Sequence, residues 1–353
     1  MLSILPGLIS ASLTFILTFF VIRFAKKLKI IDDPRGKSHP KVIHTYPTPR
    51  AGGLALFGGI AVASLLFLPL DKHLAGILAG GLVLAIVGFF DDRRDLNPYL
   101  RLILGFLAAG LPIAAGIGIS FISNPFGGGT LDLSTPRITF EFLGEARSIW
   151  ILSDIFALFW IVFMMNMLNM GAKGVDGQLP GVVVVAAGTI AALSLKFSAD
   201  VTQWQVIVLA LIVGGAYLGF LPWNFYPQKI MPGYGGATLA GYFLAILSIL
   251  ATTKVGALTT VLAVPLIDTG YTIIRRVING KSPVWGDTGH LHHRLLRLGW
   301  GKRRVAIFYW GITLVLGVIS LNLNTHLKFY TMVGISLALG GIILWLTRKR
   351  SPH

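Results

Sequence analysis

The chain has 353 residues and a formal net charge of +16; 54% of its residues are hydrophobic and 12% are charged. With a mean hydropathy of +0.76, it is too apolar to fold as a soluble globular domain. It contains no cysteine, which excludes disulfides, thiol catalysis and thiolate metal ligands. These properties indicate an integral membrane protein that works without cysteine chemistry.

Long apolar segments recur from one end of the chain to the other. Each has roughly 17–22 residues, enough for a helix to cross a bilayer core of about 30 Å. They predict an all-α polytopic membrane protein with ten or eleven transmembrane helices, in a single domain over residues 1–353. The expected spans are 3–23, 51–70, 75–90, 100–119, 148–165, 181–197, 204–222, 236–252, 255–274, 305–322 and 329–347. Polar and apolar residues alternate over 137–142, the period of a strand, which predicts a small β-hairpin on the outer side.

The distribution of lysine and arginine predicts the orientation. If the N-terminus lies outside, 24 of the 30 Lys and Arg residues fall on the inner side, where they exceed the eight acids by 16. The positive-inside rule explains most of this excess, and attraction of anionic substrates and lipid phosphates is compatible with it. We therefore expect a multi-pass protein of the plasma (inner) membrane, with its C-terminus inside and its active site on the cytoplasmic face.

Small residues on the helices allow close helix approach. Gly76/Gly80 and Gly215/Gly219 form two GxxxG pairs, which we interpret as structural. Such faces permit a homodimer without requiring one.

Polar residues gather in five inner segments, 24–50, 91–99, 166–180, 223–236 and 275–304, which we expect to form one site. Ionisable residues at membrane helix ends are costly to keep and are functional candidates. In the first segment, prolines hold the chain extended and basic residues, including Arg50, lead into the second span. This pattern suits phosphate binding and a polybasic membrane anchor equally well.

The second segment contains Asp91-Asp92-Arg93-Arg94-Asp95. Clustered carboxylates at a helix end can bind Mg²⁺ or supply a base or nucleophile. The alternative is a topological anchor in which Arg93 and Arg94 neutralise the acids. Three of the eight inner acids lie here, which favours a functional role.

The third and fourth segments are rich in glycine. Asn166 and Asn169 share a face at the inner end of a span, and a turn with Lys173 and Asp176 follows. Amides and a carboxylate suit hydrogen bonds to a sugar or a nucleobase; a capping turn explains the glycines but not an amide at membrane depth. Residues 231–237, which include Tyr234, are expected to be a flexible loop compatible with a phosphate-bearing ligand.

The fifth segment is the most specific. Its polar residues are Asp268, which we expect at the end of a helix, and then Asp287, His290, His292, His293 and Arg294. Three histidines in four residues suggest zinc at first sight, but there is no HExxH spacing and no thiolate. Cationic or donor histidines beside an arginine favour diphosphate recognition.

Together these segments resemble the polyprenyl-phosphate N-acetylhexosamine-1-phosphate transferases from about residue 32 to residue 300. The matching strings are Pro47-Thr48-Pro49-Arg50-Ala51-Gly52-Gly53, Gly88-Phe89-Phe90-Asp91-Asp92-Arg93-Arg94-Asp95, Asn166-x-x-Asn169, Val264-Pro265-x-x-Asp268-Thr269 and His290-Leu291-His292-His293-Arg294-Leu295. The last string is more similar to the branch that uses UDP-GlcNAc for wall teichoic acid, O-antigen or common-antigen synthesis. It is less similar to the branch that uses UDP-MurNAc-pentapeptide.

The resemblance implies transfer of GlcNAc-1-phosphate from a UDP-sugar to undecaprenyl phosphate, with release of UMP, at the first membrane step of cell-envelope polysaccharide synthesis. The implied partners are the UDP-sugar, the polyprenyl phosphate and membrane lipid; nucleic acid is not among them. Catalytic roles are implied for Asp91, Asp92, Asp95 and Asp268, and Mg²⁺ ligation for Asp91, Asp92 and Asp176. Substrate binding is implied for Arg50, Asn166, Asn169, Lys173, Asp176, Tyr234, Asp287, His290, His292, His293 and Arg294.

Two departures from the family pattern bear on the metal. The third motif normally reads Asn-x-x-Asn-x-x-Asp-Gly-x-Asp-Gly, but here Ala172-Lys173-Gly174, one residue longer, replaces the first Asp-Gly. A Gly-Asp-x-Gly-Ser string, whose Asp is a principal Mg²⁺ ligand, is replaced by Gly233-Tyr234-Gly235-Gly236-Ala237. The resemblance implies Mg²⁺ as the cofactor; our hypothesis is that Lys173 supplies positive charge to the diphosphate in its place, with Tyr234 donating a hydrogen bond.

The sequence leaves other functions open. A diverged homologue would bind lipid phosphate or nucleotide sugar without transfer, and a catalytic one could use another UDP-sugar. A transporter or flippase is disfavoured because the inner acids lie at helix ends rather than at mid-membrane, and no inverted repeat is visible.

Overall fold

The computed structural model describes residues 4–36, 44–124, 129–142, 145–197, 199–200, 202–251, 254–282 and 289–348. The helices are α1 (Leu5–Lys27), α2 (Gly52–Phe67), α3 (Lys72–Arg94), α4 (Pro98–Ala114), α5 (Ile151–Gly171), α6 (Gln178–Leu195), α7 (Gln203–Asn224), α8 (Gly233–Leu250), α9 (Lys254–Val261), α10 (Ala263–Ile278), α11 (Leu291–Arg297), α12 (Lys302–Asn322) and α13 (Thr325–Arg348). The strands are β1 (Ile31–Asp32), β2 (Thr48–Pro49), β3 (Phe121–Ser123), β4 (Thr130–Asp132), β5 (Arg137–Phe142) and β6 (Glu145–Trp150), and η1 (Pro34–Gly36) is a 3₁₀ turn.

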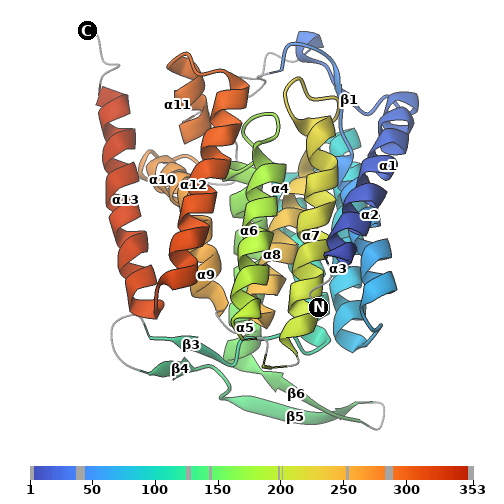
Figure 1. The fold of residues 1–353 in the computed structure, drawn as a ribbon, viewed down its shortest axis with the longest axis vertical. Helices are drawn as coiled ribbons and strands as arrows, with labels where there is room; N and C mark the ends of the chain where they lie inside the picture. The colour runs from blue at the N-terminus through green and yellow to red at the C-terminus, as the bar shows by residue number, and fades with distance from the viewer. Residues whose placement is uncertain are drawn as a thin grey trace.

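The long helices run side by side in one bundle (Figure 1). Strands β1 and β2 and helix α11 lie at one end of this bundle, which also holds the C-terminus; we call it the α11 end. The hairpins β3–β4 and β5–β6 lie at the opposite end, the hairpin end, nearer the N-terminus. The hairpin expected from the alternation over 137–142 is confirmed: β5 pairs antiparallel with β6, with Arg137 opposite Trp150.

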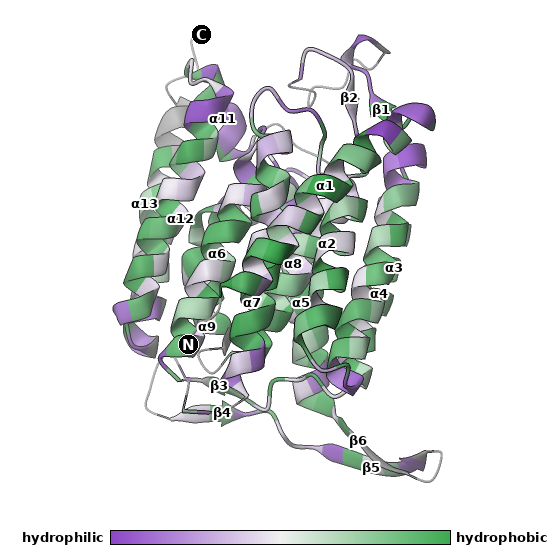
Figure 2. Cartoon of the chain, turned by 45° about the vertical axis from the view of Figure 1, so that its right-hand side comes forward, coloured by the Kyte–Doolittle hydropathy of each residue, from purple (hydrophilic) through white to green (hydrophobic). Residues whose placement is uncertain are grey.

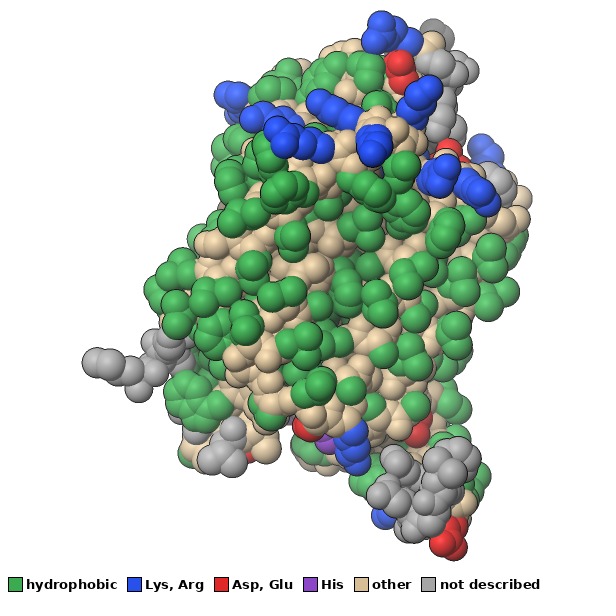
Figure 3. Space-filling view, turned by 90° about the vertical axis from the view of Figure 1, so that its right-hand side faces the viewer, with side chains coloured by type: hydrophobic (Ala, Val, Ile, Leu, Met, Phe, Trp, Pro, Cys, Tyr) green, Lys and Arg blue, Asp and Glu red, His purple; other side chains and the backbone are tan. Residues whose placement is uncertain are grey.

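The surface has the polarity of a membrane protein. Hydrophobic side chains cover the middle of the bundle, and lysines and arginines gather at the α11 end (Figures 2 and 3). Large apolar side chains such as those of Ile103 and Leu337 are 64% and 73% exposed. An apolar surface of this extent indicates contact with lipid. The protein is therefore an all-α, multi-pass membrane protein with small accessory sheets.

Within the described residues, seven helices are long and apolar enough to cross a bilayer: α1, α3, α5, α6, α7, α8 and α12. Helices α9 and α10 pass the same test together, but they bend by 83° at their junction. The continuous helix expected over 255–274 is thus broken at Leu262. Pro265 lies in the first turn of α10, where a missing backbone N–H is tolerated. Asp268 consequently lies inside α10, not at the end of a helix as the sequence predicted.

Glycines bring three helix ends together at the α11 end. A Cβ on Gly88 of α3 would lie 2.3 Å from the Cα of Gly235, and one on Gly53 of α2 would lie 2.6 Å from the backbone nitrogen of Gly236. Only glycine permits this approach. The first turn of α8 is therefore packed directly against α2 and α3, so residues 233–237 form a buried helix start and not the expected flexible loop. In this way the packing positions the carboxylates that end α3.

The GxxxG pairs are used inside the chain. A Cβ on Gly215 or Gly219 of α7 would lie 2.1 Å from the carbonyl oxygen of Gly7 or 2.0 Å from that of Ala11, both in α1. Gly80 is covered in the same way by Tyr242 of α8. A homodimer would have to use a different surface.

Candidate active site

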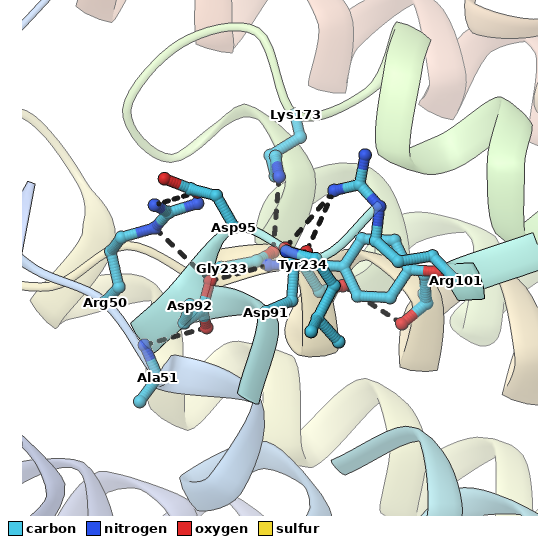
Figure 4. A network of polar contacts seen from close by, with 11 residues as sticks. Arg50, Ala51, Asp91, Asp92, Asp95, Arg101, Lys173, Gly233 and Tyr234 are labelled. Atoms are coloured by element: carbon cyan, nitrogen blue, oxygen red, sulfur yellow. Dashed lines mark hydrogen bonds and ion pairs between the residues drawn. The ribbon is translucent and has the colours of Figure 1, made fainter. Parts of the chain in front are cut away.

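Asp92 joins three elements at the α11 end. Its Oδ2 accepts a hydrogen bond from the Ala51 N–H at 3.0 Å, and its Oδ1 accepts one from the Tyr234 N–H at 3.1 Å. Arg50 Nε lies 3.3 Å from the same Oδ1 (Figure 4). The carboxylate thus sits at the N-terminal ends of α2 and α8, where unpaired N–H groups favour an anion. It is buried, and its partners hold it in one orientation.

Asp91 faces the start of α4. Its two oxygens lie 3.1 and 3.3 Å from Arg101 NH1, and Oδ1 also accepts a hydrogen bond from the Leu96 N–H at 3.0 Å. Arg93 and Arg94 are exposed instead. The buried acids are therefore neutralised by Arg50 and Arg101, and not by the two arginines that follow them in the sequence.

Lys173 approaches the carboxylates from the turn after α5. Its ammonium donates to the carbonyl oxygen of Gly233 at 3.4 Å, beside Asp92 (Figure 4). Burial lowers the pKa of Lys173 to about 8, and the charge of Asp92 opposes this shift. The Tyr234 side chain is buried and lies under the Arg101 guanidinium, 5.0 Å from ring centroid to Cζ. The two residues that replace the family's acids are thus neighbours at the start of α8.

Gly233 is required where α8 begins. Its φ is +69°, and an added Cβ would lie 2.0 Å from Asp92 Oδ2. We expect Gly233→Ala to lower the thermal unfolding midpoint, because it combines about 1–2 kcal/mol of left-handed backbone strain with a clash at a buried carboxylate. Gly280→Ala is the control: φ is +65° there and the space around its Cβ is open. Equal midpoints for the two variants in detergent would contradict the clash.

The turn between α5 and α6 links the carboxylates to the histidines. Lys173 faces the carboxylates, while the next residue, Gly174, lies so close to His292 that an added Cβ would be 2.3 Å from the ring. Asp176, two residues later, accepts a hydrogen bond from Lys302 Nζ at 3.3 Å. Four consecutive residues, 173–176, therefore bring the second, third and fifth polar segments together.

The histidines are ordered by Asp268. Its Oδ2 lies 2.9 Å from His290 Nδ1, and its Oδ1 accepts the Leu291 N–H at 2.7 Å, where α11 begins. The His292 ring stacks on that of His290 at 5.5 Å and lies 4.4 Å from that of His293. Burial, with the neighbouring His293 and His290, lowers the pKa of His292 well below its usual range, so this ring is neutral near pH 7. The ring can take part in hydrogen bonds at this pH but carries no positive charge.

Several polar atoms around this turn are buried without a partner among the described residues: Asn169 Oδ1, Asp176 Oδ2 and His292 Nδ1. Such atoms are typical of places that bind water or a ligand. Asn166 differs, since its amide donates to the Val162 carbonyl oxygen at 2.8 Å. Arg294 Nε donates to the Gly289 carbonyl oxygen at 2.8 Å, and Asp287 lies outside the described residues.

The residues present do not fit the Mg²⁺ of the family pattern. Among the described residues, no group of three or more His, Asp and Glu side chains is placed to hold a metal. All four oxygens of Asp91 and Asp92 already accept from N–H donors, and one oxygen of Asp176, Oδ1, accepts from Lys302. Three acids, Asp91, Asp92 and Asp95, are balanced by three cations, Arg50, Arg101 and Lys173. The site is electrically balanced by its own side chains.

Two residues of the site were not among those expected to contact substrate. Arg101 pairs with Asp91, and Lys302 pairs with Asp176. The sequence did contain a signal for Arg101, because Asn97-Pro98 is a typical start of a new helix. The Asn97 side chain accepts a hydrogen bond from the Tyr99 N–H, and the helix that begins there turns back toward α3. Lys302 had no comparable signal, because its partner is 126 residues away.

Comparison with known proteins identifies the family. Residues 74–252 match the model of glycosyl transferase family 4. The chain is similar to the probable undecaprenyl-phosphate N-acetylglucosaminyl 1-phosphate transferase of Bacillus subtilis (30% identity; 92% of this chain, 86% of the relative). It is also similar to the decaprenyl-phosphate N-acetylglucosaminephosphotransferase of Mycolicibacterium smegmatis (31%; 92% and 82%) and, at 25% identity (91% and 98%), to the phospho-N-acetylmuramoyl-pentapeptide-transferase of Staphylococcus epidermidis. The chain belongs to glycosyl transferase family 4, as its motifs indicated.

Proposed function

We propose that the protein transfers GlcNAc-1-phosphate from UDP-GlcNAc to undecaprenyl phosphate and releases UMP. The observation that carries this proposal is the buried carboxylate pair, Asp91 and Asp92, bracketed by the cations Arg50, Arg101 and Lys173 at one end of a membrane bundle. Relatives at about 30% identity over most of the chain support the donor sugar and the polyprenyl acceptor.

The proposed topology has eleven crossings. The seven long spans, the bent pair α9–α10, the shorter apolar helices α2 and α4, and α13 account for them. An odd number agrees with termini at opposite ends of the bundle (Figure 1). The excess of basic residues at the α11 end supports an outer N-terminus and a cytoplasmic site.

In this reaction, an oxygen of the lipid phosphate attacks the β-phosphorus of the UDP-sugar. A new P–O bond forms to the lipid phosphate as the bond from the β-phosphorus to the bridging oxygen breaks, and UMP leaves with that oxygen. The second pKa of a phosphate monoester is about 6, so the nucleophile needs little deprotonation at neutral pH. Asp91 and Asp92, whose oxygens are all engaged, serve best as positioning residues that hold the cations around the reacting phosphates.

Lys173 supplies the charge that Mg²⁺ supplies in the family pattern. Its ammonium lies at the N-terminus of α8, beside the position where Tyr234 replaces the expected metal ligand. Neutralising negative charge on the transferring phosphoryl group is the main contribution that a protein makes to such a reaction.

The direct test is transfer of labelled GlcNAc-1-phosphate by the purified protein. Undecaprenyl phosphate should accept the label, whereas undecaprenol, which lacks the phosphate, should not. Nucleotide-sugar binding without transfer to any polyprenyl phosphate would overturn the proposal and favour the non-catalytic alternative that the loss of two acids raises.

The pKa of Lys173 sets a pH dependence. The ammonium is protonated below about pH 8 and loses its charge as the pH rises through that value. We therefore expect kcat/KM, measured between pH 6.5 and 10, to decline above pH 8, with a slope that approaches a tenfold loss per pH unit. Lys173→Arg keeps its charge throughout this range and should remove the decline. An identical decline in both proteins would assign it to another group.

A further inference from the structure

The turn that carries Lys173 and Asp176 is closed by the side chain of Gln178. This turn joins Gly171, the last residue of α5, to Gln178, the first residue of α6. The Gln178 side chain spans it: Nε2 donates to the Gly171 carbonyl oxygen at 3.1 Å, and Oε1 accepts the Val175 N–H at 3.1 Å. The residue is fully buried. One amide therefore ties the end of α5 to the middle of the turn.

Gln178 is itself held in place by two other helices. Its carbonyl oxygen accepts from Trp310 Nε1 of α12 at 3.3 Å, and the same Nε1 lies 3.1 Å from the carbonyl oxygen of Gly177. The Gly177 N–H donates to Asn224 Oδ1 of α7 at 3.0 Å. The backbone of Gln178 is therefore anchored to α7 and α12, independently of the turn that its side chain closes.

The turn cannot be stiffened by larger residues of its own. A Cβ added to Gly171 would lie 2.5 Å from the Pro265 carbonyl oxygen, and one added to Gly174 would lie 2.3 Å from the His292 ring. Both positions therefore require glycine, whose backbone has more freedom than that of any other residue. Lys173 lies between these glycines, so a constraint from outside the pair is needed to fix it.

We propose that Gln178 is a positioning residue for the transfer reaction: its two hydrogen bonds hold the turn so that the Lys173 ammonium stays at the Gly233 carbonyl oxygen, beside Asp92 (Figure 4). The inference rests on the proposed function and adds to it a residue just past the third motif of the family, which ends at Gly177. Displacing a reacting group or its partner by about 1 Å costs on the order of 100-fold in rate. The turn decides where the Lys173 backbone lies, and hence where its side chain meets the diphosphate.

Gln178→Met is the first test. Methionine keeps the length and approximate volume of the side chain but removes both hydrogen bonds. We expect kcat for transfer of GlcNAc-1-phosphate to undecaprenyl phosphate to fall about tenfold.

Gln203→Met is the matched control. Gln203 is the first residue of α7, is buried, and donates through Nε2 to the Leu250 carbonyl oxygen at 3.5 Å. It lies about 30 Å along α7 from Asn224, which contacts the turn. The control should change kcat less than twofold.

The pH profile separates positioning from a structural role. The charged groups that face Lys173 are Asp91 and Asp92 of α3, Arg50 before α2 and Arg101 of α4. Burial is the largest influence and lowers the pKa of Lys173 to about 8. When the turn loosens, the ammonium gains water and its pKa rises toward its usual value, so the alkaline decline in kcat/KM should begin at least about half a pH unit higher. Loss of folded protein would instead scale the whole profile without moving it.

The double variant Lys173→Ala with Gln178→Met shows whether Gln178 acts through the lysine. If it does, losing Gln178 should slow the Lys173→Ala protein by less than twofold. A further tenfold loss would show that Gln178 acts on another group, such as Asp176 on the same turn, and would overturn the inference. An alkaline decline that does not move in the single variant would overturn it too.

The pKa of Lys173 can also be followed without turnover. The pH dependence of its labelling by an amine-reactive reagent, read by mass spectrometry, should move upward in Gln178→Met, and identical profiles would contradict positioning. If the wild-type protein transfers nothing, the proposed function fails, and the labelling profiles still decide the role of Gln178. Gln178→Asn, one methylene too short to make both hydrogen bonds, should give the same shift and replaces Gln178→Met if that variant unfolds in detergent.

Discussion

Lys173→Ala is expected to lower kcat for GlcNAc-1-phosphate transfer by at least about 100-fold, whereas excess EDTA should leave the wild-type rate unchanged. Removing a single preorganised charge that stabilises a transition state costs on the order of 10²–10³ in rate. In the proposed mechanism Lys173 provides this charge, and it lies half-buried beside the carboxylate pair and the start of α8. No bound metal is then needed to balance the diphosphate.

Lys229→Ala is the matched control for this prediction. Lys229 is another lysine of the polar segments, 5.2 Å from the centroid of the Trp223 ring, and its backbone N–H donates to the Trp223 carbonyl oxygen. Its loss removes the same charge from the protein and should change kcat less than twofold. Strong inhibition of the wild-type enzyme by EDTA, with full rescue by Mg²⁺, would refute the role assigned to Lys173.

Restoring the two family acids is expected to make the enzyme metal-dependent. Lys173→Asp alone changes the local balance from three acids and three cations to four acids and two cations, a net charge of −2, and should abolish transfer. Adding Tyr234→Asp brings the net charge to −3 and places two carboxylates beside Asp91 and Asp92. Carboxylate oxygens are the ligands that Mg²⁺ prefers. With Mg²⁺, the double variant should be at least about tenfold more active than Lys173→Asp alone, and in EDTA it should show no such gain.

Metal binding gives this prediction a second readout. Titration calorimetry should detect Mg²⁺ binding to the double variant, Lys173→Asp with Tyr234→Asp, and not to the wild type. The control is Lys173→Asn with Tyr234→Asn, which has side chains of the same shape without the negative charges. It should neither bind Mg²⁺ nor regain activity. A double Asp variant that binds Mg²⁺ but transfers no better than Lys173→Asp would show that the lysine is not a substitute for the metal.

The sequence by itself determined the membrane class, and seven of the expected spans coincide with described helices long enough to cross a bilayer. Apolar length decides whether a helix can cross a bilayer, and this property can be read locally. The period over 137–142 likewise predicts β5, because alternation is a local property of a strand. The candidate residues of the site stood out in the sequence because acids, amides and histidines are rare in so apolar a chain, and their roles stay a prediction.

The partners of those residues were decided only by the tertiary structure. In the sequence, the cations nearest to Asp91 and Asp92 are Arg93 and Arg94. In the structure, Arg101 pairs with Asp91 and Arg50 with Asp92, because helix packing brings these arginines next to the carboxylates.

The start of α8 and the state of the histidines depend on packing in the same way. Gly88 lets α3 touch Gly235, and this contact turns an expected loop into a buried helix start held by Asp92. Burial, not residue type, makes His292 neutral. Pairing and ionisation follow from distances between segments far apart in the chain, and those distances are set by how closely the helices pack.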